Sequence, residues 1–186
     1  MLQGQLCLEA FLLLKERKKN MKEKIFIDMD GTLAEFRKAE HLEDLYEKGY
    51  FLDLKPLKFL DTANKLISFT NNVFILSAYL HDSKYALEEK KIWLKKYMPE
   101  LKAESCIFVP CGKNKADYVP NLNQDCFLID DFSLNLLCWE ESGGTGIKML
   151  NGINGSKGTW AEKHKNKRTL CVTSTVEDVI KEIGNN

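Results

Sequence analysis

The sequence predicts an α/β fold in which a parallel β-sheet carries helices on both faces. Apolar runs of strand length recur along the chain, and amphipathic segments of helical length separate most of them. This alternation is typical of βαβ units, whose crossover helices cover the sheet. The chain has 186 residues, of which 44% are hydrophobic, so it can bury the core of a single globular domain.

Six apolar runs are predicted to form the strands of this sheet. They span residues 24–28, 73–77, 106–110, 126–130, 146–150 and 169–173. In parallel sheets of this kind, ligands bind beyond the carboxyl ends of the strands. Polar residues that directly follow these runs are therefore the first candidates for a functional site.

Helices are expected between the strands and after the last strand. Residues 55–70 form one amphipathic segment, and residues 83–97 form another that ends before Pro99. Ser174 is followed by Glu177 three positions later, which predicts a capping box at the start of the last helix.

The chain is expected to divide into a peripheral N-terminal segment, 1–20, and a core domain, 21–186. In the first segment an apolar stretch precedes a basic cluster, which is the reverse of the order in a signal peptide. The stretch is also too short to span a bilayer, so we expect a peripheral amphipathic helix or an upstream start of translation. Residues 34–54, rich in charged and aromatic side chains, have the size of a small helical cap inserted after the first strand.

The composition argues against several classes of partner. Lys plus Arg balance Asp plus Glu at 27 each, so no overall charge attracts nucleic acid or an anionic membrane. The six cysteines include no C-x-x-C pair and the three histidines are scattered, which argues for reduced thiols and against a zinc site. We expect a cytoplasmic protein without a stable nucleic-acid partner or a membrane, and a homodimer is left open.

Two carboxylates follow the first strand and are the strongest candidates for catalysis. Asp28 and Asp30 flank one residue, and Gly31 lets the backbone turn, so both acids can converge on one point. One acid could attack a substrate while the other handles a proton. The competing interpretation is that both acids only terminate the strand and form an Asx turn.

A second acidic pair, Asp130 and Asp131, lies at the end of the apolar run 126–130. Burying these acids beside Asp28 would be costly without a compensating cation. Hard oxygen ligands suit Mg²⁺, which retains several waters and also binds a substrate phosphate. We expect Asp28, the backbone carbonyl of Asp30 and Asp130 to hold Mg²⁺, with Asp131 at or next to the ion.

The run IFIDMDGTL, residues 25–33, closely resembles the nucleophile motif of the haloacid dehalogenase (HAD) superfamily. The resemblance implies a Rossmann-like (HAD-like) core and phosphoryl transfer through an aspartyl-phosphate. Asp28 would then attack phosphorus, and Asp30 would protonate the leaving oxygen and afterwards activate water.

Three later motifs of the superfamily find counterparts in the same order along the chain. Ser77 ends the second predicted strand, and the resemblance implies that its hydroxyl and adjacent N–H groups, including that of Ala78, hold a phosphoryl oxygen. The third motif is a lysine that neutralises nucleophile and phosphate together. We favour Lys115, which stands where a helix should begin, with Lys113 as a close alternative. The acidic pair after residues 126–130 matches the fourth motif.

From residue 21 to about residue 160 the chain resembles the 5'(3')-deoxyribonucleotidase family and its bacterial and phage-like relatives. The run D-G-T-L-A-E-F places Phe36 where that family lines its base or sugar pocket. G-Y-F at 49–51 resembles its short cap, and E-K-x-x-W at 89–93 places Lys90 near the phosphate. The alternative is that the aromatic side chains of these motifs only pack in the core or the cap.

We therefore predict a Mg²⁺-dependent phosphomonoesterase, specifically a 5'-nucleotidase that hydrolyses deoxynucleoside monophosphates. One alternative keeps the chemistry and changes the substrate to a sugar phosphate or another small metabolite. A second alternative is a non-catalytic domain that binds a nucleotide or a partner. The chain departs from the mammalian-type pattern in its S-A-Y at 77–79 and in lacking an arginine shortly before Lys113, which leaves the base preference open.

Overall fold

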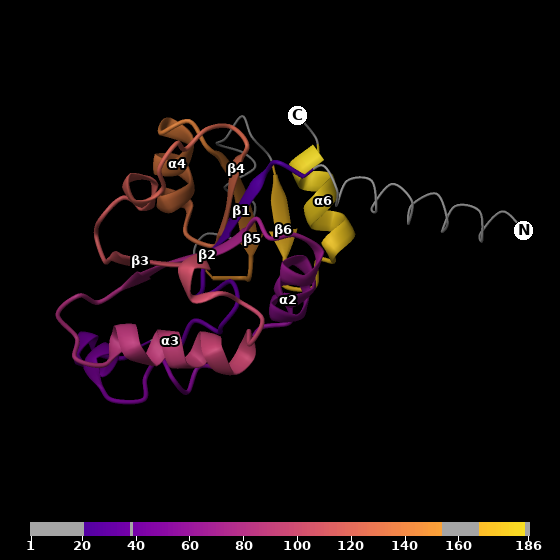
Figure 1. Cartoon of the computed structure of the whole chain (residues 1–186). Helices are drawn as coiled ribbons and strands as arrows, with labels where there is room; N and C mark the ends of the chain where they lie inside the picture. Colours follow the sequence, from indigo (N-terminus) through magenta and orange to yellow (C-terminus); the bar gives the residue numbers. More distant parts are fainter. Residues whose placement is uncertain (1–20, 38, 154–167, 185–186) are drawn as a thin grey trace, which may run out of the picture.

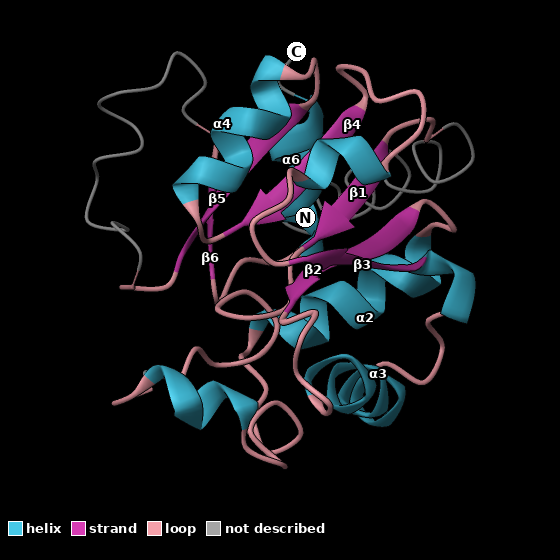
Figure 2. Cartoon of the chain, turned by 90° about the vertical axis from the view of Figure 1, so that its left-hand side faces the viewer, coloured by secondary structure: helices cyan, strands magenta, loops and turns pink. Residues whose placement is uncertain are grey.

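The computed structural model describes residues 21–37, 39–153 and 168–184, which form a six-stranded parallel sheet with helices on both faces (Figures 1 and 2). The strands are β1 Lys24–Ile27, β2 Val73–Tyr79, β3 Cys106–Pro110, β4 Cys126–Asp130, β5 Thr145–Leu150 and β6 Thr169–Cys171. Their order across the sheet is β3-β2-β1-β4-β5-β6. The predicted fold class and all six predicted strand regions are confirmed, while the expectation for the segment 1–20 lies outside the described residues.

In the described ranges, four α-helices cover the sheet and three short 3-10 helices lie in the connections. The α-helices are α2 Phe59–Phe69, α3 Ala86–Tyr97, α4 Ser133–Glu141 and α6 Val176–Gly184. The 3-10 helices are η1 Leu42–Tyr46, η2 Ala103–Ser105 and η3 Lys115–Tyr118. Within the described ranges, no helix has both the length and the apolar character needed to cross a membrane.

The alternation of side chains along β1 divides the core into two layers. Ile25 and Ile27 are fully buried in a cluster that includes residues of α2, α3 and α6. Phe26 faces the other way and packs against Trp139 of α4, with ring centroids 5.2 Å apart. Figure 2 shows the same division, with α2 and α3 below the sheet and α4 above it. The parallel strands are therefore covered on both faces, which leaves their ends open.

The first helix begins later than predicted, because tertiary pairing holds the start of the segment 55–70 in an extended form. Pro56 pairs with Ala34 in an antiparallel bridge, and the N–H of Leu57 donates to the carbonyl of Leu33 over 2.7 Å. These contacts tie the turn after β1 to the entry of α2. Helical periodicity in a sequence cannot reveal such a long-range bond.

Two further helix starts differ from the prediction by one to three residues. Ser83 lies three residues before the start of α3, and its hydroxyl accepts from the N–H of Ala86, the first helical residue, at 3.2 Å. The last helix is capped one residue later than expected. The Thr175 hydroxyl accepts from the N–H of Asp178, whose carboxylate in turn accepts from the N–H of Thr175 at 2.8 Å. Ser174 instead accepts from the N–H of Cys171 at 3.0 Å.

The segment 34–54 crosses from β1 to α2 and contains the 3-10 helix η1. Three aromatic side chains of the predicted nucleotidase motifs are buried, with exposed fractions of 6% for Tyr50, 7% for Phe51 and 0% for Trp93. Phe36 differs from them, since 45% of its surface is exposed. Packing therefore explains the first three aromatic residues, and Phe36 alone stands open to solvent.

Candidate active site

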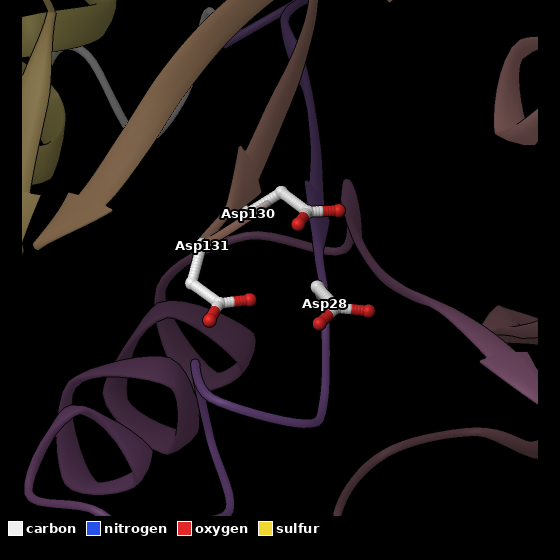
Figure 3. Close-up of side chains that lie close together, drawn as sticks. All are labelled: Asp28, Asp130 and Asp131. Atoms are coloured by element: carbon white, nitrogen blue, oxygen red, sulfur yellow. The ribbon is translucent and has the colours of Figure 1, made fainter. Parts of the chain in front are cut away.

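Three carboxylates meet where the central strands β1 and β4 end (Figure 3). The two strands pair in parallel, with Ile27 opposite Ile129, so Asp28 and Asp130 emerge side by side. Asp131 follows directly, and one carboxylate oxygen from each of the three acids lies within 4.8 Å of the others. All three are buried, with exposed fractions of 6%, 0% and 2% along the chain. The structure thus brings together the acids that the sequence placed at two separate strand ends.

Lys115 supplies the positive charge nearest to these acids. Its Nζ lies 2.6 Å from Oδ1 of Asp28 and 2.7 Å from Oδ2 of Asp130, and the lysine is 2% exposed. The side chain of Asn114 accepts from the N–H of Ala116 at 3.1 Å and so caps η3 at its first residue, Lys115. Lys113, the other candidate, is exposed. The geometry therefore selects Lys115 as the lysine of this cluster.

The electrostatic state of Asp28 depends on its neighbours. Burial raises the pKa of the Asp28 carboxyl from 3.8 to about 8; Lys115 opposes this rise, and Asp130, Asp30 and Asp131 add to it. Burial would lower the pKa of Lys115, but Asp130 and Asp28 outweigh it and raise that pKa above its usual value. A divalent cation among the carboxylates would favour the ionised form of Asp28. This set of buried, hard oxygen donors fits Mg²⁺.

Two asparagines that the sequence analysis did not select orient the acidic pair. The amide of Asn135 donates to Oδ2 of Asp130 at 2.9 Å, and that of Asn151 donates to Oδ2 of Asp131 at 2.8 Å. Asn151 also donates to the carbonyl of Gly31 at 2.6 Å, which connects the ends of β5 and β1. Asn151 directly follows β5, as the acids of the site follow or end their strands.

Lys148 is a further cation that sequence reasoning missed. It lies on β5 opposite Asp130, and it is fully buried. Its Nζ donates to the backbone carbonyl of Asp131 and to the hydroxyl of Ser133, the latter at 2.9 Å. Burial lowers the pKa of Lys148, and Asp131 and Asp130 oppose that effect. Lys148 thereby fixes the backbone that carries Asp131 into the cluster.

A second group joins Asp30 to β2, which continues two residues past Ser77, its predicted last residue. Lys90 of α3 is fully buried, and its Nζ forms an ion pair with Asp30. The same Nζ donates to Ser77 Oγ at 3.0 Å and to the Ala78 carbonyl at 2.7 Å. Four predicted site residues are thus in direct contact. Oδ1 of Asp30 is buried without a hydrogen-bond partner in the described part of the chain, so it could accept a hydrogen bond from a bound group.

Gly31 allows the turn after β1 to pass beneath Asp131. Its φ is +79°, a conformation that L side chains rarely adopt, and a Cβ here would lie 2.3 Å from Oδ2 of Asp131. The carbonyl of Met29 accepts from the N–H of Leu33 at 2.8 Å and of Ala34 at 2.9 Å, which closes the turn. A glycine is therefore required both by the backbone angle and by the space left beside the acid.

No family model matches the sequence, and no curated protein sequence matches it. Among solved structures, the chain is similar to D,D-heptose 1,7-bisphosphate phosphatase from Burkholderia thailandensis, with a TM-score of 0.57 and 13% sequence identity. The match covers 86% of this chain and 99% of that chain. The similarity confirms the predicted Rossmann-like, HAD-like fold. At this identity it establishes the fold alone, and the resemblance to the deoxyribonucleotidase family stays a prediction.

Proposed function

We propose that the chain is a Mg²⁺-dependent phosphomonoesterase that forms an aspartyl-phosphate, an acyl phosphate, on Asp28. The observation that carries this proposal is the convergence of Asp28, Asp130 and Asp131 around Lys115 at the carboxyl end of the sheet. The similarity in fold to a bisphosphate phosphatase supports the same class of reaction. The substrate would enter at this edge of the sheet, where ligands of open α/β folds bind.

In the proposed reaction, Asp28 is the nucleophile. One of its carboxylate oxygens forms a bond to phosphorus while the ester P–O bond breaks, and the leaving oxygen takes a proton from Asp30. Water then attacks phosphorus and transfers a proton to Asp30, the bond to Asp28 breaks, and inorganic phosphate leaves. Lys115 keeps the attacking carboxylate oriented, since it bonds both Asp28 and Asp130.

The charges of the site support binding of a phosphate group. Asp28, the carbonyl of Asp30, Asp130 and Asp131 would hold Mg²⁺, which would neutralise phosphoryl oxygens and the Asp28 carboxylate when bound. Ser77 and the N–H of Ala78 would bind phosphoryl oxygens at the end of β2, with Lys90 next to them. Lys113 is exposed and has no role in this proposal.

For the substrate we propose a nucleoside monophosphate, with deoxynucleotides favoured. The support is the D-G-T-L-A-E-F and E-K-x-x-W motifs together with the exposed ring of Phe36, onto which a base could stack. A sugar phosphate is the second candidate. It is favoured by the similarity in fold to a D,D-heptose 1,7-bisphosphate phosphatase.

Phosphate release from purified protein tests the function and separates the two substrates. The panel contains dUMP, dTMP, ribonucleotides, sugar phosphates and an aryl phosphate, each with Mg²⁺ and with EDTA. Metal-dependent turnover that is highest on deoxynucleotides supports the proposal. Turnover of sugar phosphates with none on nucleotides would show that the substrate is a sugar phosphate. If the folded protein released phosphate from no compound of the panel, a non-catalytic binding domain would be favoured.

A further inference from the structure

We infer that Glu89 is a positioning residue that anchors the cap loop, residues 47–54, and so holds the ring of Phe51 against Lys90. Lys90 in turn contacts Asp30, the proposed acid. The inference rests on the proposed function for its kinetic consequences. The anchoring itself rests only on contacts of the described residues.

Glu89 is a buried acid with backbone partners. It is 6% exposed, and its carboxylate accepts from the N–H of Gly49 at 2.5 Å and from the N–H of Phe51 at 3.1 Å. Among the residues that the structure describes, none forms an ion pair with Glu89. Burial of a carboxylate is costly unless its oxygens receive hydrogen bonds or face a cation, and here two N–H groups of one loop donate those hydrogen bonds. Glu89 therefore binds the backbone of the loop rather than a side chain, and it stabilises the conformation that points both N–H groups at it.

Trp93 holds the other end of the same loop. It follows Glu89 by four positions, which places both side chains on one face of α3. Its Nε1 donates to the carbonyl of Leu54 at 2.7 Å. Within the loop, Gly49 has a φ of +93° and accepts from the N–H of Asp53 at 3.0 Å. The loop thus forms a turn, and side chains of α3 bind backbone atoms in the middle of it and at its last residue.

The anchored loop places an aromatic ring on the lysine of the site. Nζ of Lys90 lies 4.9 Å from the ring centroid of Phe51, close enough for a cation–π contact. The ring is 7% exposed, and Lys90 is fully buried beside it. The three residues of the E-K-x-x-W motif therefore have different roles. Glu89 and Trp93 hold the cap loop, and Lys90 between them reaches the catalytic edge.

Hydrogen exchange in the variant Glu89→Gln tests the anchoring without any substrate. A glutamine amide has one acceptor oxygen in place of two, so one of the two loop N–H groups loses its partner. We expect exchange in residues 47–54 to become about 5- to 30-fold faster. The matched control is Glu88→Gln, because Glu88 is exposed and, in the described part of the chain, forms its ion pair with Lys91 on the same helix. Equal loop exchange in Glu89→Gln, Glu88→Gln and wild type would overturn the inference.

Kinetics of Glu89→Gln and Phe51→Leu test whether the anchor acts through the ring on Lys90 and Asp30. We expect Glu89→Gln to lower kcat/KM about 5- to 30-fold on alkyl phosphates and less on an aryl phosphate, whose leaving group needs no proton. Phe51→Leu should give the same pattern without faster loop exchange, and the double variant should be no worse than Glu89→Gln. If the losses in kcat/KM of the two single variants add in the double variant, or if each variant loses as much on the aryl phosphate as on alkyl phosphates, Glu89 does not act on Lys90 and Asp30 through Phe51. Absence of turnover in the wild type would refute the proposed function, and the exchange result would still decide the anchoring.

Discussion

Nζ of Lys115 lies 2.6 Å from Oδ1 of Asp28, although 87 positions separate the two residues. The same Nζ lies 2.7 Å from Asp130, so one buried cation holds acids from two neighbouring strands. The relationship satisfies two requirements together. It stabilises carboxylates that have left water, and it aligns the acid that we propose as the nucleophile.

Lys115→Met should remove both the stabilisation of the buried acids and the alignment of Asp28. The variant leaves two buried carboxylates without their cation, so we expect a loss of about 3–5 kcal/mol in the free energy of unfolding. Activity should fall by about 10²- to 10³-fold, since the proposed nucleophile Asp28 loses the charge that orients it. Denaturant unfolding and phosphate release measure the two quantities. Lys113→Met is the control and should change stability by less than about 0.5 kcal/mol; a larger loss in Lys113→Met than in Lys115→Met would reverse the assignment.

Asp30→Asn should affect substrates according to their leaving groups. The variant cannot protonate the leaving oxygen, so turnover of alkyl phosphates such as nucleotides should fall by about 10²- to 10⁴-fold. An aryl phosphate has a leaving group that departs without a proton, and its first step should be affected far less. The burst of phenol in rapid-mixing kinetics measures that first step. A uniform loss on both classes of ester would remove Asp30 from the role of acid.

Gly31→Ala should displace Asp131. Gly31 has a φ of +79° and would place a Cβ 2.3 Å from Oδ2 of that acid, whereas Gly112 has a φ of +85° and nothing within 4 Å. Both alanine variants carry the left-handed strain, worth about 1–2 kcal/mol. Only Gly31→Ala adds the clash, so we expect it alone to weaken Mg²⁺ binding measured by titration calorimetry. Equal Mg²⁺ affinity in the two variants would show that Asp131 does not help to hold the ion.

The stability of the metal-free protein should fall as pH rises. The pKa of Asp28 is about 8 in the folded protein and 3.8 as its ordinary value, so between these values the folded state keeps a proton that the unfolded state has lost. The free energy of unfolding therefore decreases across this interval. Mg²⁺ binds the ionised site, so its stabilising effect should grow over the same range and reach about 2.7 kcal/mol at 100 times its Kd.

Thermal melts with Mg²⁺ or EDTA, at about pH 5 and about pH 8, measure this linkage. The shift in Tm caused by Mg²⁺ should be larger at the higher pH, and Asp28→Asn should lose most of that difference. If Mg²⁺ raises Tm equally at both pH values, binding of the ion does not require Asp28 to lose a proton.

The position of the candidate site could be predicted because its main residues lie at or near the ends of apolar strands. Asp28 directly follows β1, Asp130 ends β4 and Ser77 lies two residues before the end of β2. Parallel strands bring their carboxyl ends to the same side of the sheet. Lys115 was identified from its place at a helix start, but the choice over Lys113 required the distances to both acids. The sequence therefore predicted the members of the site better than their pairing.

Residues that act through loops and backbone contacts could not be found in this way. Asn135 and Asn151 meet the acids only after α4 and the end of β5 have packed, and asparagine is common in turns. Lys148 interrupts an apolar strand and finds its partner in the carbonyl of Asp131. The late start of α2 has the same cause, because Pro56 pairs with Ala34 across the fold.

Trapping the covalent intermediate tests the central claim most directly. Borohydride reduces an aspartyl-phosphate to homoserine, and peptide mass spectrometry locates the altered residue. During turnover with Mg²⁺, we predict homoserine at position 28, and none in the Asp28→Asn variant or with EDTA. Turnover of a phosphate ester with position 28 unmodified, or with the modification at another acid, would contradict the account.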